Sequence, residues 1–201
     1  MDAKPTELLA YFEGKKQNVV PLFQRAYSWV RKDWDAFWHD VVECLETDDL
    51  GARHFLGAVV SLPVPSVPIG VSKHLIIDGQ QRLTTTALLL AAVRDVAADR
   101  PSGEPLADEI NDLLVNRHQT GPDRAKLMPT EPDRAAFMRI LRGEPIDGLG
   151  EGERPRIARG YAHFRDLVSR LADDGTKDPP DAPEELPAAM SDPEAAAAAA
   201  E

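Results

Sequence analysis

The chain has 201 residues, 43% of them hydrophobic and 28% charged, which is the balance of one globular domain with its own core. The formal net charge is −11, but residues 171–201 hold nine acids and one lysine, whereas residues 1–170 hold 25 acids and 22 bases. This distribution excludes a basic footprint over the whole domain and leaves room only for a local basic patch. No apolar run reaches the roughly 18 residues that span a membrane, and residues 1–4 do not begin a signal peptide, so we expect a cytoplasmic protein.

The N-terminal part is predicted to form a short helix over residues 6–13 and a short strand that begins at residues 18–20. Residues 21–29 have no clean period and mix aromatic side chains with Gln24 and Arg25. Such a mixture is typical of a surface loop with a functional task.

Residues 31–46 are predicted to form an amphipathic helix, because apolar residues recur at helical spacing. These residues are Trp34, Phe37, Trp38, Val41, Val42 and Leu45. The spacing of the two tryptophans favours core packing over base stacking. Cys44, the single cysteine, lies seven residues after Phe37 on the same face, so we expect a buried structural thiol rather than a nucleophile.

Two strands that pair with each other are predicted next. Residues 54–62 are predicted to form a strand buried on both faces, and residues 74–77 the following strand. A mostly apolar helix over residues 81–98 should lie in the middle of the domain. Further elements are predicted as helices over 106–117, 131–141 and 156–171 and a short extended segment over 124–129.

The composition changes after Ala172, where five prolines, nine acids and the alanine run of residues 195–200 follow. We therefore expect one domain over residues 1–172. Residues 173–201 are expected to be an acidic Pro/Ala-rich linker or the edge of an expressed fragment.

The stretch from Ile76 to Thr86 places a strand, a glycine turn and a helix in succession. The first N–H groups of a helix have no intrahelical acceptor, and together with the helix dipole they bind anions. Arg82 adds a guanidinium that pairs with phosphate, and Asp78 is suited to hold magnesium or orient water. The stretch therefore favours a phosphate ligand, although no P-loop, kinase or Ser/His/Asp motif is present.

A second polar pair, Gln24-Arg25, is as poorly suited to a core as Gln80-Gln81-Arg82, so the two pairs should face a ligand or each other. The alternative is a polar network in which Asp78 pairs with Arg25 or Arg82 and merely fixes the turn.

Five segments, in order, resemble the N-terminal domain of GmrSD-type modification-dependent restriction proteins, and the resemblance covers about residues 5–170. The segments are Pro21-Leu22-Phe23-Gln24-Arg25-Ala26-Tyr27-Ser28-Trp29, residues 54–60, Ile77-Asp78-Gly79-Gln80-Gln81-Arg82-Leu83-Thr84-Thr85, residues 126–129 and residues 161–164. The resemblance implies an α/β (α+β) chain with a ParB/sulfiredoxin-like fold. Such a fold is a small mixed sheet surrounded by helices, here with additional C-terminal helices.

The resemblance also implies an activity, namely Mg²⁺-dependent hydrolysis of NTP, with GTP favoured and UTP also accepted. Hydrolysis would control cleavage of modified phage DNA by a separate C-terminal HNH-type nuclease domain, and some relatives sense phosphorothioate-modified DNA. No His-Asn-His pattern follows residue 170, so we expect no DNA cleavage by this chain itself.

Carried onto this sequence, the resemblance implies a set of site residues. The implied catalytic residues are Asp78, Gln80, Gln81 and Arg82, with Asp78 also as the metal ligand and one glutamine orienting water. The implied nucleotide-binding residues are Gln24, Arg25, Gly79, Arg82 and Thr84. In sulfiredoxin a Gly-Cys-His-Arg loop would overlay residues 79–82, and glutamine at position 80 excludes the thiol chemistry of that loop.

A second hypothesis is a reader of modified DNA in which nucleotide acts only as a regulator. Pro21, Tyr27 and Trp29 would then form an apolar pocket for the modification, with core packing as the alternative for the two aromatic rings. The DNA backbone would be contacted by Lys15, Lys16, Arg31 and Lys32. A third, purely structural hypothesis is a scaffold for a nuclease, which predicts no nucleotide binding.

Overall fold

The computed structural model describes residues 6–46, 55–65, 70–146 and 155–179. Within these ranges the chain forms a mixed α/β fold, which confirms the expected α+β class. The elements are η1 (Leu8–Tyr11), β1 (Lys16–Val19), α1 (Arg31–Glu46), β2 (Val60–Pro63), β3 (Ser72–Asp78), α2 (Gln80–Ala98), α3 (Glu104–Leu114), η2 (Gly121–Arg124), β4 (Leu127–Met128), α4 (Glu131–Leu141) and α5 (Arg156–Asp174).

The strands of the described residues form one sheet in the order β2-β3-β1-β4. β1 is parallel to both β3 and β4, and β2 is antiparallel to β3, so the predicted pairing of two strands is confirmed. Because β1 and β3 are parallel, the segments that follow them leave the sheet at the same edge. This topology brings the loop after β1 next to the turn between β3 and α2.

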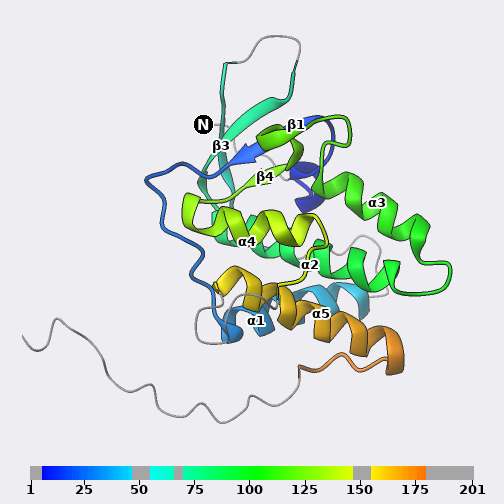
Figure 1. Cartoon of the computed structure of the whole chain (residues 1–201). Coiled ribbons are helices and arrows are strands. Elements are labelled where there is room, and N and C mark those ends of the chain that lie inside the picture. The colour runs from blue at the N-terminus through cyan, green and yellow to red at the C-terminus, as the bar shows by residue number, and fades with distance from the viewer. Residues whose placement is uncertain (1–5, 47–54, 66–69, 147–154, 180–201) are drawn as a thin grey trace, which may run out of the picture.

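Helix α2 runs through the middle of the molecule (Figure 1) and packs against α3, α4 and α5. Leu83 and Leu88 are 0% exposed, and burial of each leucine side chain contributes about 2 kcal/mol. Gly160 of α5 lets that helix approach closely, since a β-carbon there would lie 3.2 Å from Trp34 Cε2 and 3.3 Å from Leu88 Cδ1. The predicted central position of this helix is therefore confirmed.

Helix α1 has the predicted bounds, and Trp34, Phe37 and Trp38 are buried, so core packing of the tryptophans is confirmed. The expectation for Cys44 is wrong, because its thiol is exposed. The apolar stripe continues into the last turn of α1. Within the described part of the chain nothing packs over Leu45 in that turn enough to bury it, and its side chain is 67% exposed. The apolar periodicity correctly predicted which face of α1 is buried. It could not predict how far along the helix that face is covered by other elements.

The strand predicted over residues 54–62 is wrong in extent and burial. β2 covers only Val60–Pro63, is half-buried to exposed, and lies at the edge of the sheet. Residues 55–59 are not part of a strand, and Gly57 has a positive φ of 97° that breaks an extended chain. The first residue of the prediction, His54, lies outside the described residues.

The C-terminal boundary predicted at residue 172 falls inside α5, which continues to Asp174. Beyond the helix, Trp38 Nε1 donates a hydrogen bond to the Lys177 carbonyl oxygen at 2.6 Å. The tail expected at residues 173–201 is described only as far as residue 179, and the alanine run lies outside the described residues. Among the helices of the described chain, none is both long and apolar enough to cross a membrane.

Candidate functional site at the turn between β3 and α2

The turn begins where β3 ends at the exposed residue Asp78. Gly79 caps α2 in the left-handed region, with φ 85°, and Asp78 Oδ1 accepts a hydrogen bond from its N–H at 2.8 Å. A β-carbon at Gly79 would lie 2.8 Å from Val59 Cγ2 and 3.1 Å from the Ala58 carbonyl oxygen. Only glycine fits both the conformation and the space, and the turn leaves the first N–H groups of α2 for an anion.

Four hydrogen bonds join residues 24–28 to residues 77–81. Gln24 Nε2 donates to the Ile77 carbonyl at 2.9 Å, and Gln80 Nε2 to the Arg25 carbonyl at 3.1 Å. Gln81 Nε2 donates to Ala26 O at 3.3 Å, while Gln81 Oε1 accepts the N–H of Ser28 at 2.9 Å. The two polar motifs therefore do lie together.

The two glutamines differ in how their amides are used. Both are 9% exposed, but Gln81 uses its nitrogen and its oxygen to hold the loop. Gln80 uses its nitrogen, and its Oε1 has no hydrogen-bond partner among the described residues. Gln81 is thus a clamp between α2 and the loop, whereas Gln80 keeps an acceptor for a ligand or water.

Arg82 is half-buried and lies against the segment before β2. Its Nη1 donates to the Ala58 carbonyl, and a β-carbon on Gly57 would lie 2.7 Å from its Cζ atom. Arg25 is exposed, and among the described residues neither arginine forms an ion pair with Asp78. The alternative network, in which an arginine–aspartate pair merely fixes the turn, is not formed.

A cavity of about 270 Å³ opens beside Arg82. It is lined by Trp29, Asp33, Ala36, Phe37, Asp40, Leu56 and Arg82. Of the segment before β2, Leu56 lines this cavity and Ala58 and Val59 lie against Gly79, a contact that was not predicted. The available signal was Gly57, an isolated glycine inside an apolar run, which indicates a close backbone approach.

Tyr27 anchors the loop of residues 24–28 to the core, and its side chain is 5% exposed. Its hydroxyl lies 2.7 Å from Thr85 Oγ1 and accepts a hydrogen bond from Trp34 Nε1 at 2.8 Å, and its N–H donates to Asp133 Oδ2 at 2.7 Å. Burial raises the pKa of Tyr27, so the phenol stays protonated. Asp133 also accepts a hydrogen bond from Thr130, a helix-start pair that was visible in the sequence as Thr-x-x-Asp.

The three apolar candidates for DNA contact are largely covered. Pro21 and Tyr27 are buried, so the core-packing alternative describes Tyr27. Trp29 is half-buried and packs against Phe37, with ring centroids 6.1 Å apart. Thr84, a candidate nucleotide-binding residue, is 3% exposed.

The four basic candidates for DNA contact lie in two separate places. Lys16 pairs with Ser72, six residues before Asp78 along β3, which places Lys15 and Lys16 about 20 Å from the turn. Lys16 Nζ donates to the Ala10 carbonyl. At the start of α1, Lys32 is exposed, and Arg31 Nε lies 3.5 Å from Asp35 Oδ2. The roles of these four cations in DNA binding stay predictions.

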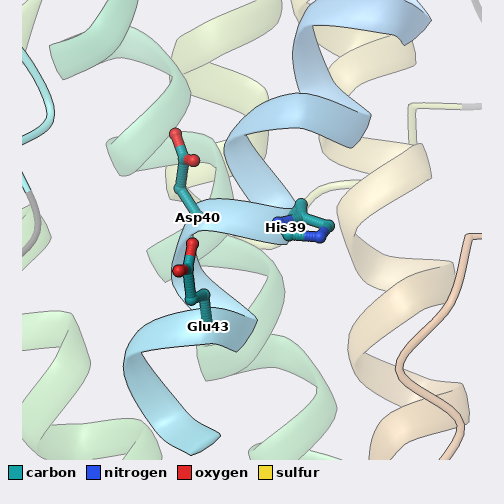
Figure 2. Close-up of side chains that lie close together, drawn as sticks. All are labelled: His39, Asp40 and Glu43. Atoms are coloured by element: carbon teal, nitrogen blue, oxygen red, sulfur yellow. The ribbon is translucent and has the colours of Figure 1, made fainter. Parts of the chain in front are cut away.

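Asp78 suits the predicted magnesium ion, because Mg²⁺ is commonly held by one or two carboxylates together with phosphate oxygens and water. Elsewhere in the described chain, the potential ligand atoms of His39, Asp40 and Glu43 lie within 4.8 Å of one another. Figure 2 shows the three side chains projecting from one stretch of α1. His39 and Glu43 are exposed, and exposed acidic groups commonly lie together without a metal ion, so we assign no ion to this cluster.

The comparison with known families decides the classification. The family model of the GmrSD restriction endonuclease N-terminal domain matches residues 8–179. The chain belongs to this family. No curated protein matches the chain. The match spans every candidate residue above, and it gives this GmrSD N-terminal domain a role in restriction, the defence against phage DNA.

Proposed function

We propose that this GmrSD N-terminal domain hydrolyses NTP, with GTP favoured and UTP also accepted, to control DNA cleavage by a separate HNH-type nuclease domain. One observation carries the proposal. The loop of residues 24–28 is bound to the first turn of α2, and this contact brings the loop that carries Arg25 beside the Asp78 turn and the helix start that carries Arg82. Such groups together suit a triphosphate with a magnesium ion.

Each group has a distinct role in this proposal. The N–H groups that follow Gly79 and the guanidinium of Arg82 bind phosphate oxygens, and Arg25 approaches from the loop. The Asp78 carboxylate holds the ion on its exposed side, and Gln80 Oε1 accepts a hydrogen bond from the attacking water. When bound, magnesium supplies positive charge that offsets the charge developing on the phosphates.

The test is hydrolysis of the four NTPs by this chain, with and without modified DNA. We expect phosphate release by the wild type and its loss in Arg82→Ala and in Asp78→Ala, with the fold retained because both side chains are partly or fully exposed. Turnover like that of the wild type in both variants would refute the proposal. Absence of any hydrolysis by the wild type, with nucleotide still bound, would instead favour the modified-DNA reader.

A further inference from the structure

The aromatic residues of this chain are distributed unevenly between core and surface. All twelve Phe, Tyr and Trp residues lie in the described ranges, and ten of them are buried or half-buried. The two exceptions are Phe23, which is 80% exposed, and Phe55, which is 83% exposed. Core packing therefore explains ten rings and leaves these two without a structural role.

Both exposed rings belong to the two segments that contact the turn between β3 and α2. Phe23 directly precedes Gln24, whose amide is bonded to the Ile77 carbonyl. Phe55 lies two residues before Gly57, against which the guanidinium of Arg82 is placed. Gln24 and Gly57 thus hold the two segments that carry these rings against the turn of the proposed phosphate site.

A nucleotide presents an aromatic base at a distance from its charged phosphates. A protein that binds both parts needs polar groups for the phosphates and a flat apolar surface beside them for the base. Base stacking on aromatic side chains is one of the main sources of affinity in nucleotide recognition, and it accepts every base because each has a π-face. Exposed phenylalanines on the segment that carries Arg25 and on the segment that contacts Arg82 meet that requirement.

We propose that Phe23 and Phe55 form the nucleobase-stacking surface of this site and hold the base of the bound NTP. The inference rests on the proposed phosphate site at residues 78–82. It assigns base binding to two exposed rings, whereas the ring of Tyr27 in the same loop is 5% exposed and bonded within the core. Stacking of this kind binds purine and pyrimidine bases alike.

The test compares binding of GTP, inorganic tripolyphosphate and a single-stranded oligonucleotide by calorimetry. Phe23→Ala and Phe55→Ala should each raise the Kd for GTP about tenfold. Phe23→Tyr and Phe55→Tyr, which keep an aromatic ring, should bind GTP with the Kd of the wild type. Binding of tripolyphosphate, which has no base, should be unchanged in all four variants. Leu106→Ala, which removes a side chain that is 49% exposed on α3, is the control and should bind GTP like the wild type.

The outcomes separate the two proposals. An unchanged Kd for GTP in both alanine variants overturns the stacking surface, and so does an equal weakening of tripolyphosphate, which would mean that the rings only position the loops. Weakened binding of the oligonucleotide with unchanged GTP binding also overturns it, because the base would then come from DNA. If the wild type binds neither GTP nor tripolyphosphate, the phosphate site fails and the stacking surface fails with it.

Discussion

The guanidinium of Arg82 lies so close to Gly57 that a β-carbon there would be 2.7 Å from Cζ and 2.8 Å from Nη1. Gly57→Ala should therefore displace Arg82 from the site and reduce NTP hydrolysis toward the level of Arg82→Ala. The positive φ of 97° adds backbone strain of about 1–3 kcal/mol, measurable by urea unfolding.

Gly14 provides the matched control for this prediction. It also has a positive φ, 71°, but a β-carbon there would meet nothing within 4 Å. Gly14→Ala should thus show a similar strain and keep full turnover. Equal turnover in the two variants would contradict the close contact between Gly57 and Arg82.

The two glutamines should separate stability from turnover. Gln81→Ala leaves the Ser28 N–H and the Ala26 carbonyl without their partners, which should lower the free energy of unfolding by about 1–3 kcal/mol. Gln80→Ala removes one loop contact and the acceptor for water, so it should cost less stability and lower kcat. Urea unfolding and steady-state hydrolysis measure the two effects. A larger loss of stability in Gln80→Ala together with a larger loss of kcat in Gln81→Ala would contradict these two roles.

Tyr27→Phe should destabilise the protein although it removes a single oxygen. The hydroxyl accepts a hydrogen bond from Trp34 Nε1 and lies 2.7 Å from Thr85 Oγ1, and both groups would be left buried without that partner. We expect a loss of about 1–3 kcal/mol in the free energy of unfolding. Tyr11→Phe, at a half-buried tyrosine, is the control, and an equal effect of the two changes would speak against Tyr27 as the anchor of the loop.

The helices were more predictable than the site, for a physical reason. Helices α1 and α4 have the bounds that apolar periodicity indicated, Arg31–Glu46 and Glu131–Leu141, because a helix buries one face along its whole length. The segment before β2 was misassigned as a strand, since its apolar residues serve a close approach to Gly79 and Arg82 and no sheet pairing. A local pattern does not show which distant backbone a residue will contact.

The sequence predicted that the two polar motifs of the candidate site lie together. It did not predict the role of each residue within them. Sequence placed Gln24-Arg25 opposite Gln80-Gln81-Arg82, and four hydrogen bonds join these segments. From the sequence, Gln80 and Gln81 were equivalent candidates. In the structure they differ because the Oε1 atom of Gln81 accepts the Ser28 N–H. The opposite burial of Tyr27 and Phe23, two aromatic residues in one loop, likewise depends on the tertiary partners of Tyr27.

Acid should destabilise the fold through His163. Burial lowers the pKa of His163 below its ordinary value of 6.5, and Asp35, 2.7 Å from Nε2, opposes this shift without overcoming it. The unfolded chain therefore binds a proton more readily, and the stability present above pH 6.5 is lost as the pH falls through the folded-state pKa.

The prediction is measured by urea unfolding at about pH 7.5 and about pH 5.5 in the wild type and in His163→Gln, whose amide does not titrate. The loss of stability on acidification should be smaller in the variant. An identical loss in both proteins would mean that other groups, such as His74 with its pKa also lowered by burial, account for the acid sensitivity.

The central claim is that residues 78–82 and the loop of residues 24–28 form one phosphate site. Calorimetric titration with a slowly hydrolysed GTP analogue and magnesium tests it most directly, because binding is measured without turnover. We predict one site per chain in the wild type and a Kd raised at least about tenfold in Arg25→Ala and in Arg82→Ala. Arg117→Ala, which removes a surface arginine paired with Asp108 and Asp112, should bind like the wild type. No binding by the wild type, or unchanged binding in both site variants, would contradict the claim.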